Sequence, residues 1–190
     1  DPTYVQPAAK NLAVPSDFVF KDVFIAQTHV QRPDDPYLEL VGHRYALIKV
    51  NATSASGAAA PDMVATVTDK TGAVLGSLRL TGPANLPTSV DLPSLTNLGT
   101  QSHSNSYEAP LPSDWIQPGI TITVTAGAGN SAQELTHFSP SVGADATLTV
   151  RDLSMSMFEA NQGAYITGLG SWGQEAVAKL PVQTLKLYEY

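Results

Sequence analysis

The stretch Asp62–Leu80, DMVATVTDKTGAVLGSLRL, decides the fold class. Its first part is rich in β-branched residues, and its last part returns with a second β-rich run. Between them, Asp69–Gly72 has the composition of a tight turn, because glycine adopts the left-handed backbone conformation that closes such turns. The stretch therefore predicts an antiparallel hairpin, with Val74, Leu78 and Leu80 on one face of the return strand.

Further strands are predicted on both sides of this hairpin. Ile120–Thr125 alternates strictly between apolar and hydroxyl residues, and the Pro-Gly pair at 118–119 is typical of a type II turn. Ala46, Ile48 and Val50 would share one face of another strand. The other predicted β-rich runs are Phe18–His29, Leu38–Thr53, Tyr107–Leu111 and Asp145–Phe158.

Many short strands and a single helical pattern predict an all-β protein. We expect an Ig-like or fibronectin-like antiparallel β-sandwich over residues 18–158. Residues 1–17 contain three prolines and predict an extended lead-in. Residues 159–190 predict a short tail towards a downstream domain that is absent from this chain, and this tail carries the one predicted helix, Gln174–Leu180, which Pro181 ends.

Composition excludes several function classes. Of the 190 residues, 43% are hydrophobic and 14% are charged, so uncharged polar residues must fill much of the surface, as is common in secreted or cell-surface bacterial proteins. The net charge is −7 and there is no basic run, which argues against binding to nucleic acid or anionic lipid. No stretch approaches the roughly 18 apolar residues of a membrane span. There is no cysteine, and the start Asp1-Pro2-Thr3 suggests a mature or trimmed N-terminus.

Catalytic motifs are weak or missing, and we predict neither catalytic nor metal-binding residues in this chain. The histidines form neither H-x-H nor H-E-x-x-H, and no G-x-S-x-G occurs. Residues 168–173 match G-x-G-x-x-G, but Trp172 would crowd a pyrophosphate and no parallel βαβ pattern surrounds them, so a connector is favoured. The alternatives left open are a zinc site built from distant histidines, a hidden serine triad and a calcium role for Asp34 and Asp35. The four histidines are His29, His43, His103 and His137, of which we expect one on an edge strand or in the core and three on the surface.

The two tryptophans are the candidates for binding a glycan or a partner, because sugar rings stack on exposed aromatic faces. Trp115 precedes the 118–119 turn, so a core position at a corner of the sandwich is favoured over a sugar platform. Trp172 lies in the tail and is predicted to be more open. Asn51-Ala52-Thr53 matches the glycosylation sequon, which would have no meaning in a bacterial product.

The chain resembles the N-terminal region of large secreted zinc metalloproteases of the TagA and dictomallein type. This group includes the mucin-degrading protease that cuts C1 esterase inhibitor. The resemblance runs in order over roughly residues 18–187. It is carried by Val23–Val30 (VFIAQTHV), Leu40–Val50 (LVGHRYALIKV), Val74–Leu80 with Pro83 and Leu86-Pro87, and Tyr107–Pro112 followed by Trp115–Gly119.

The resemblance implies a bacterial, exported parent protein that uses zinc to cut mucin-like glycoproteins. The family's motif H-E-x-x-H-x-x-G-x-x-H is absent here, so no catalytic or metal residue carries over, and this chain is expected to need no cofactor. What carries over is the role of an Ig-like module before the protease domain, with that domain and a mucin-type glycoprotein as partners. The alternatives are a free-standing module that binds a glycan or host protein, and a structural or adhesion domain of a surface protein.

Overall fold

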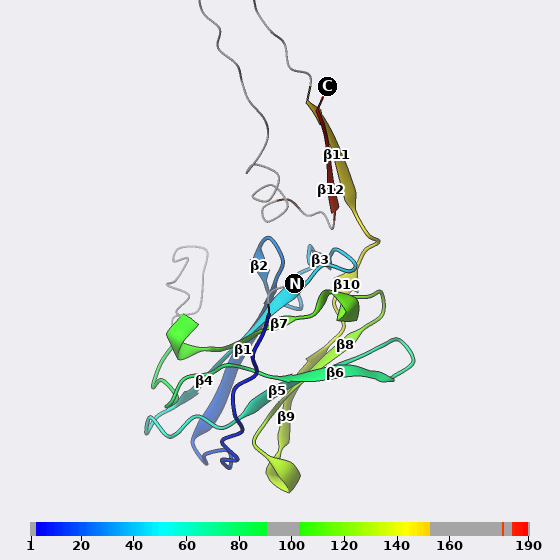
Figure 1. Cartoon of the computed structure of the whole chain (residues 1–190). Coiled ribbons are helices and arrows are strands. Elements are labelled where there is room, and N and C mark those ends of the chain that lie inside the picture. Colours follow the sequence, from blue (N-terminus) through cyan, green and yellow to red (C-terminus); the bar gives the residue numbers. More distant parts are fainter. Residues whose placement is uncertain (1–2, 91–102, 153–179, 181–183, 190) are drawn as a thin grey trace, which may run out of the picture.

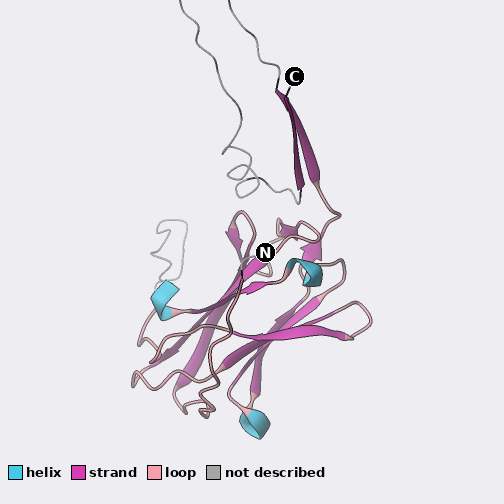
Figure 2. Cartoon of the chain, viewed as in Figure 1, coloured by secondary structure: helices cyan, strands magenta, loops and turns pink. Residues whose placement is uncertain are grey.

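The computed structural model describes residues 3–90, 103–152, 180 and 184–189, and it confirms the all-β prediction. Two four-stranded antiparallel sheets face each other, as Figures 1 and 2 show. The first sheet has the order β2-β1-β4-β7, and the second has the order β6-β5-β8-β9. Helical structure in the described residues is limited to three short 3-10 turns: η1 (His103–Asn105), η2 (Ser113–Trp115) and η3 (Gly129–Ser131).

Most predicted strands are observed close to their expected positions. The first sheet consists of β1 (Phe18–Ala26), β2 (Val30–Gln31), β4 (Ala46–Ser54) and β7 (Tyr107–Leu111). The second consists of β5 (Met63–Thr68), β6 (Val74–Arg79), β8 (Thr121–Ala126) and β9 (Gln133–Phe138). Two further short strands, β3 (Glu39–Leu40) and β10 (Ser141–Val142), pair in parallel beside the sandwich.

The core lies between the inward faces of the two sheets. Ala46, Ile48 and Val50 of β4 are fully buried, which confirms their predicted common face. Across the core, alternate residues of β8 such as Ile122 and Val124 are also fully buried. Burying such side chains stabilises the fold by roughly 1.5–3 kcal/mol for each large aliphatic residue. The period-two pattern read from the sequence is therefore the pattern that builds the core.

The predicted run Leu38–Thr53 is not one strand, which corrects the prediction. It divides into β3 and β4 at a turn where His43 has a left-handed φ of 51° and donates its backbone N–H to the Ile116 carbonyl. Beside it, Gly42 packs so closely that a Cβ atom would lie 2.8 Å from the Gly143 carbonyl oxygen. The turn bends the chain so that β3 pairs with β10, outside both main sheets.

The β5–β6 hairpin is confirmed, with one correction to its predicted face. Gly72 has a φ of 86°, and its N–H bonds to the Asp69 carbonyl. Leu78 and Leu80 are buried as expected, but Val74 is 65% exposed. The pairing passes from Val67–Gly76 to Thr68–Val74, so Leu75 is an extra residue on β6, and this bulge turns the Val74 side chain away from the core.

The predicted type II turn before β8 is also supported. Gly119 has a φ of 85°, and the Ile120 N–H bonds to the Gln117 carbonyl at 3.3 Å. Proline at the second position and glycine at the third are the residues that such a turn requires. The turn delivers Ile120 into the core, where it is fully buried.

A parallel two-stranded ribbon extends beyond the sandwich (Figure 1). It joins β11 (Thr147–Asp152) to β12 (Thr184–Glu189), with Thr147 opposite Thr184 and Asp152 opposite Glu189. The structure thus places a strand in the tail. Residues 153–158 of the predicted last strand, and residues 174–179 of the predicted helix, lie outside the described residues.

We expect Asp69→Asn to destabilise the fold at pH 7 and to matter less in acid. The Asp69 carboxylate accepts hydrogen bonds from the Thr71 hydroxyl and N–H, at 2.6 and 2.7 Å, and from the Ala73 N–H at 3.0 Å. These bonds, the Thr71 hydroxyl first, hold the pKa of Asp69 below its ordinary 3.8. The charge therefore stabilises the fold above pH 3.8, and this contribution is lost as the pH falls through the lower folded-state value.

Urea unfolding at pH 7 and pH 3 measures this difference, with the exposed Asp114→Asn as the matched control. A loss of stability that is equal at both pH values would contradict this role for the Asp69 charge.

Candidate functional site

The most extensive polar cluster in the described residues lies at one edge of the second sheet. Asp62 comes directly before β5, and Arg79 ends the neighbouring strand β6. The Asp62 side chain is only 6% exposed, and its carboxylate lies 3.8 Å from the Arg79 Nε. That nitrogen is buried and has no hydrogen-bond partner among the described residues. A buried carboxylate needs several donors, so the other donors must come from elsewhere in the chain.

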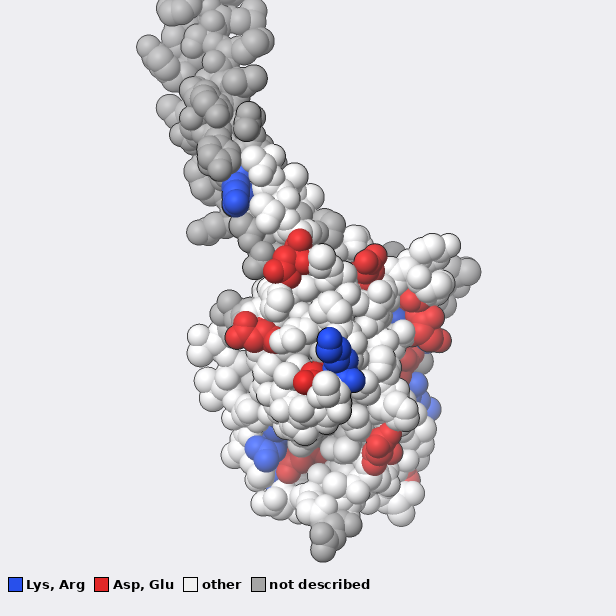
Figure 3. Space-filling model, turned by 90° about the vertical axis from the view of Figure 1, so that its right-hand side faces the viewer, with Lys and Arg blue, Asp and Glu red and all other residues white. Residues whose placement is uncertain are grey.

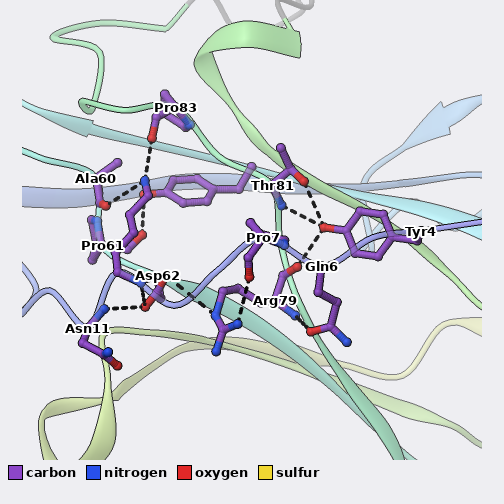
Figure 4. A network of polar contacts seen from close by, with 12 residues as sticks. Tyr4, Gln6, Pro7, Asn11, Ala60, Pro61, Asp62, Arg79, Thr81 and Pro83 are labelled. Carbon is purple, nitrogen blue, oxygen red and sulfur yellow. Dashed lines mark hydrogen bonds and ion pairs between the residues drawn. The ribbon is translucent and has the colours of Figure 1, made fainter.

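The predicted lead-in supplies these donors. The backbone N–H of Lys10 bonds to both Asp62 carboxylate oxygens, at 3.1 and 2.9 Å, and the Asn11 N–H bonds to one of them at 2.9 Å (Figure 4). Asn11 has a left-handed φ of 55°, which turns two successive N–H groups towards the same anion. Asp62 therefore holds the lead-in through its backbone.

Arg79 binds the same lead-in further upstream. Its guanidinium donates to the Pro7 carbonyl at 3.0 Å, and its backbone N–H donates to the Gln6 side-chain oxygen at 3.0 Å. The Tyr4 hydroxyl donates to the Arg79 carbonyl at 2.8 Å and accepts from the Thr81 N–H at 3.0 Å (Figure 4). Since β6 is an edge strand, these contacts satisfy the outward-facing N–H and carbonyl of Arg79, which no neighbouring strand reaches.

The Lys10 ammonium completes this arrangement, which we call the N-terminal clamp. It donates to the carbonyls of Pro83 at 2.8 Å and Ala60 at 3.2 Å. The clamp consists of Asp62, Arg79 and Thr81 together with these two carbonyls. Beneath it, the Tyr107 hydroxyl donates to the Pro61 carbonyl at 2.9 Å. Burial, and then the charge of Asp62, raise the pKa of Tyr107 far above its ordinary value, so this hydroxyl stays a donor.

The outer face of the first sheet carries an apolar pocket of about 90 Å³. The aromatic ring of Phe24 is almost fully buried there, and the Arg32 guanidinium lies 5.9 Å from the ring centroid. Lys49 is 5% exposed, and burial lowers its pKa while Glu108 opposes that shift. The pocket suits an apolar side chain of a partner better than a sugar. It is lined by Phe24, Ile25, Ala26, Val30, Leu47, Lys49 and His103.

The histidines are all exposed and lie apart from one another. His43 and His103 each approach one carboxylate, Asp145 and Glu108 respectively, at 2.7 Å, and His137 on the edge strand β9 approaches Glu134 at 2.7 Å. His29 bonds to the Thr28 hydroxyl. Within the described ranges, no three histidine or acidic side chains come together as a metal site would require, so these residues do not fit a zinc ion.

Of the two tryptophans, Trp115 lies among the described residues and Trp172 does not. Trp115 is partly buried in η2 and packs on Gly76 of β6, where a Cβ atom would lie 2.0 Å from the ring carbon Cζ2. The indole therefore packs against the core without being part of it, whereas the favoured interpretation predicted a core position. Its role in glycan binding stays a prediction. Trp172 and the G-x-G-x-x-G segment lie outside the described residues.

Two further sequence motifs have plain structural positions. Asn51 of the sequon is 7% exposed in the interior of β4, so its side chain is not presented to solvent. Asp35 accepts a hydrogen bond from the Tyr37 N–H at 2.9 Å within a turn, and Asp34 beside it is exposed.

Charged side chains on the face in Figure 3 are scattered among uncharged residues. No helix in the described part of the chain has the length and apolar character needed to cross a membrane.

The clamp was not predicted from the sequence. The available signal was the position of Asp62 and Arg79 at the open end of a hairpin whose neighbouring residues are apolar. Their partners lie about 50 to 75 residues earlier in the chain, in a segment without periodicity. The pocket was likewise not predicted, because its lining residues come from separate elements, β1, β2, β4 and η1, which the fold brings together.

Residues 97–190 match the model of the Peptidase M66 family. This match supports a metalloprotease-family domain in the second part of the chain. It includes β7, β8 and β9 of the sandwich and both strands of the ribbon, while the clamp residues Asp62 and Arg79 lie outside it. The narrower resemblance to the N-terminal region of TagA-type proteases remains a proposal.

No curated protein matches the chain. Among solved structures, the chain is similar to the C-terminal domain of wzt, with 12% identity over 81% of this chain and 85% of that chain and a TM-score of 0.39. It is also similar to the β-glucuronidase of Parabacteroides merdae, with 12% identity over 66% of this chain and 13% of that chain and a TM-score of 0.34.

We expect Gly76→Ala to destabilise the protein by about 1–3 kcal/mol, because the new methyl group would overlap the Trp115 indole and force it outwards. The tryptophan emission should shift to longer wavelength, measured with Trp172→Phe so that Trp115 alone reports. Val74→Thr, at an exposed position of the same strand, is the control and should change stability by less than about 0.5 kcal/mol. A Gly76→Ala protein with unchanged stability and emission would contradict this packing.

Proposed function

We propose that this chain is a non-catalytic accessory β-sandwich of a secreted bacterial zinc metalloprotease that acts on mucin-like glycoproteins. The observation that carries the proposal is the match of residues 97–190 to the Peptidase M66 family. The matched region starts within the sandwich and continues through the β11–β12 ribbon, so the two parts occur together in the family region. The proposed role is to place the protease domain and to support its folding.

Contacts at the end of the sandwich nearest the ribbon support a placing role. The Arg44 guanidinium, which is buried, donates to the Leu180 carbonyl just before β12. His43 contacts Asp145 just before β11 at 2.7 Å. Arg44 itself lies in a turn that the Gln27 side chain holds through the Arg44 carbonyl at 2.8 Å. Both strands of the ribbon are therefore tied to the sandwich by polar contacts.

The zinc ion is assigned to the parent protease and not to this chain. All four histidines are among the described residues, and they do not come together with acidic residues in a group of three or more. A catalytic zinc site needs three protein ligands and an open position. The proposal therefore assigns zinc chemistry to residues outside this chain and routes no step through the sandwich.

We expect the isolated chain, equilibrated with zinc and passed over a desalting column, to retain far less than one zinc ion per chain. It should leave a mucin-type glycoprotein intact. The full-length product of the same gene should cleave that glycoprotein in a reaction that a chelator stops. Stoichiometric zinc with cleavage by the chain alone, or a gene that ends at Tyr190, would overturn the proposal.

A second candidate function is a binding module for a glycan or a host protein. The apolar pocket on the first sheet favours the protein version, because most of its lining is apolar and it presents Leu47 and Val30 to a partner. The glycan version depends instead on Trp115 and Trp172.

Binding to immobilised mucin glycopeptides separates these versions. A glycan module should bind saturably and lose at least tenfold in affinity with Trp172→Ala or Trp115→Ala, while Leu47→Asp leaves binding unchanged. A protein-binding module should show the reverse pattern with its partner. The exposed Val74→Ala serves as the control for both, and absence of saturable binding to either would contradict this second function.

A further inference from the structure

We propose that the N-terminal clamp is a binding site for an extended peptide, and that residues 4–11 of this chain are its intramolecular ligand. This goes beyond the proposed accessory role, since it assigns a recognition site to a region outside the family match. The ligand class is a linear segment of the pattern Tyr-x-Gln-Pro-x-x-Lys-Asn, which is read mainly through polar contacts.

The lead-in is held as a ligand is held, without forming part of either sheet. Residues 3–15 contain no strand, yet the segment makes polar contacts to the hairpin along its length (Figure 4). Val5, beside Tyr4, is 81% exposed. Attachment therefore comes from polar contacts, with partial burial of Tyr4 near one end and Val14 after the other. A segment bound in this way can leave without opening the core.

The clamp residues are positioned by the sandwich and not by the lead-in. Asp62 is followed by the fully buried Met63, and its backbone carbonyl accepts the Gly127 N–H at 2.9 Å. Arg79 is paired with Val64 in the β5–β6 ladder. These contacts are independent of residues 4–11, so the site is formed in advance, which lowers the entropic cost of binding a peptide.

Each part of the clamp selects a chemical group. The outward-facing Arg79 carbonyl requires a donor, which the Tyr4 hydroxyl supplies, and the same hydroxyl also accepts from the Thr81 N–H, which the Glu108 carbonyl shares. The outward-facing Arg79 N–H requires an acceptor, which Gln6 supplies. Proline at position 7 restricts the peptide to an extended backbone and leaves its carbonyl free for the guanidinium.

The downstream half of the clamp selects for positive charge. Asp62 accepts two successive backbone N–H groups, and the carbonyls of Ala60 and Pro83 accept from an ammonium group. An acidic side chain in place of Lys10 would meet two carbonyl oxygens, close to the buried Asp62 carboxylate. The clamp therefore discriminates against acidic peptides and favours a lysine at this position.

An empty clamp would leave strongly polar groups unsatisfied. Without the lead-in, the buried Asp62 carboxylate would lose three N–H contacts and keep the Arg79 Nε at 3.8 Å. This penalty favours rebinding of the same segment or binding of a peptide with the same pattern.

The test cuts the lead-in from the folded chain and then offers it back. A protease site is placed at Leu12-Ala13, both of which are exposed, and the full chain is cleaved after folding. A fluorescent peptide of residues 3–12 is then titrated into the cleaved and the uncleaved chain. We expect saturable binding of one peptide to each cleaved chain and at least tenfold weaker binding to the uncleaved chain, whose clamp is already occupied.

Peptide variants separate specific recognition from general stickiness. Tyr4→Phe in the peptide removes the hydroxyl that contacts Arg79 and Thr81 and should weaken binding about tenfold. Lys10→Glu should weaken it further, whereas Val5→Ala at the exposed position should leave affinity unchanged. Using peptide variants keeps the sandwich itself unaltered.

Three results would overturn the inference. The cleaved chain could stay folded by near-ultraviolet circular dichroism and yet bind no peptide. It could bind Tyr4→Phe and Lys10→Glu as tightly as the parent peptide. It could unfold on cleavage and not recover with excess peptide, which would make the lead-in an integral structural element. None of these results depends on protease activity, so they leave the proposed accessory function to its own test.

Discussion

The edge shared by β6 and β7 is the constraint on which the rest of this sandwich depends. Each strand ends its sheet, so one side of its backbone has no neighbouring strand. Thr81 and Glu108 join the two sheets here through a pair of N–H to carbonyl bonds of 2.9 and 2.8 Å. The Tyr4 hydroxyl sits over this junction, bonded to the Arg79 carbonyl and to Thr81. The lead-in thus covers the edge with side chains and protects it from pairing with another chain.

Burial of charge at this edge adds specificity to a core that apolar packing alone would stabilise. The buried Asp62 carboxylate is tolerated because Lys10 and Asn11 direct backbone N–H groups to it. The buried Tyr107 hydroxyl donates to the carbonyl of Pro61, the residue before Asp62. Close packing leaves little freedom, since a Cβ atom at Gly82 would lie 2.3 Å from the Tyr107 ring. An alternative path for the lead-in would leave a buried carboxylate without donors, so these polar contacts select one arrangement.

The alternation of apolar and polar residues predicted the elements whose conformation depends on nearby residues. It failed for elements whose conformation depends on contacts to residues far away in the sequence. The pattern of β8 and the turn at Gly72 were predictable because each depends on residues beside it. The break at His43 was not, because its left-handed position is occupied by a histidine and it depends on bonding to Ile116, over 70 residues later. The clamp could not be predicted from the sequence for the same reason. Asp62 and Arg79 are ordinary hairpin residues until the lead-in is placed on them.

The family match and the clamp meet in one strand. β7 belongs to the matched region, yet its Tyr107 hydroxyl holds Pro61 beneath the clamp, and its Glu108 backbone bonds to Thr81 beside Tyr4. From β7 the chain continues through β8 and β9 to the end that holds the ribbon. Loss of the lead-in would therefore remove contacts beside β7, the first described strand of the matched region, while Arg44 and His43 make their polar contacts to Leu180 and Asp145, further along that region. Because β7 contacts the clamp, exchange of the peptide at the clamp would change the stability of β7. On the proposed function, β7 belongs to the sandwich that precedes the protease domain.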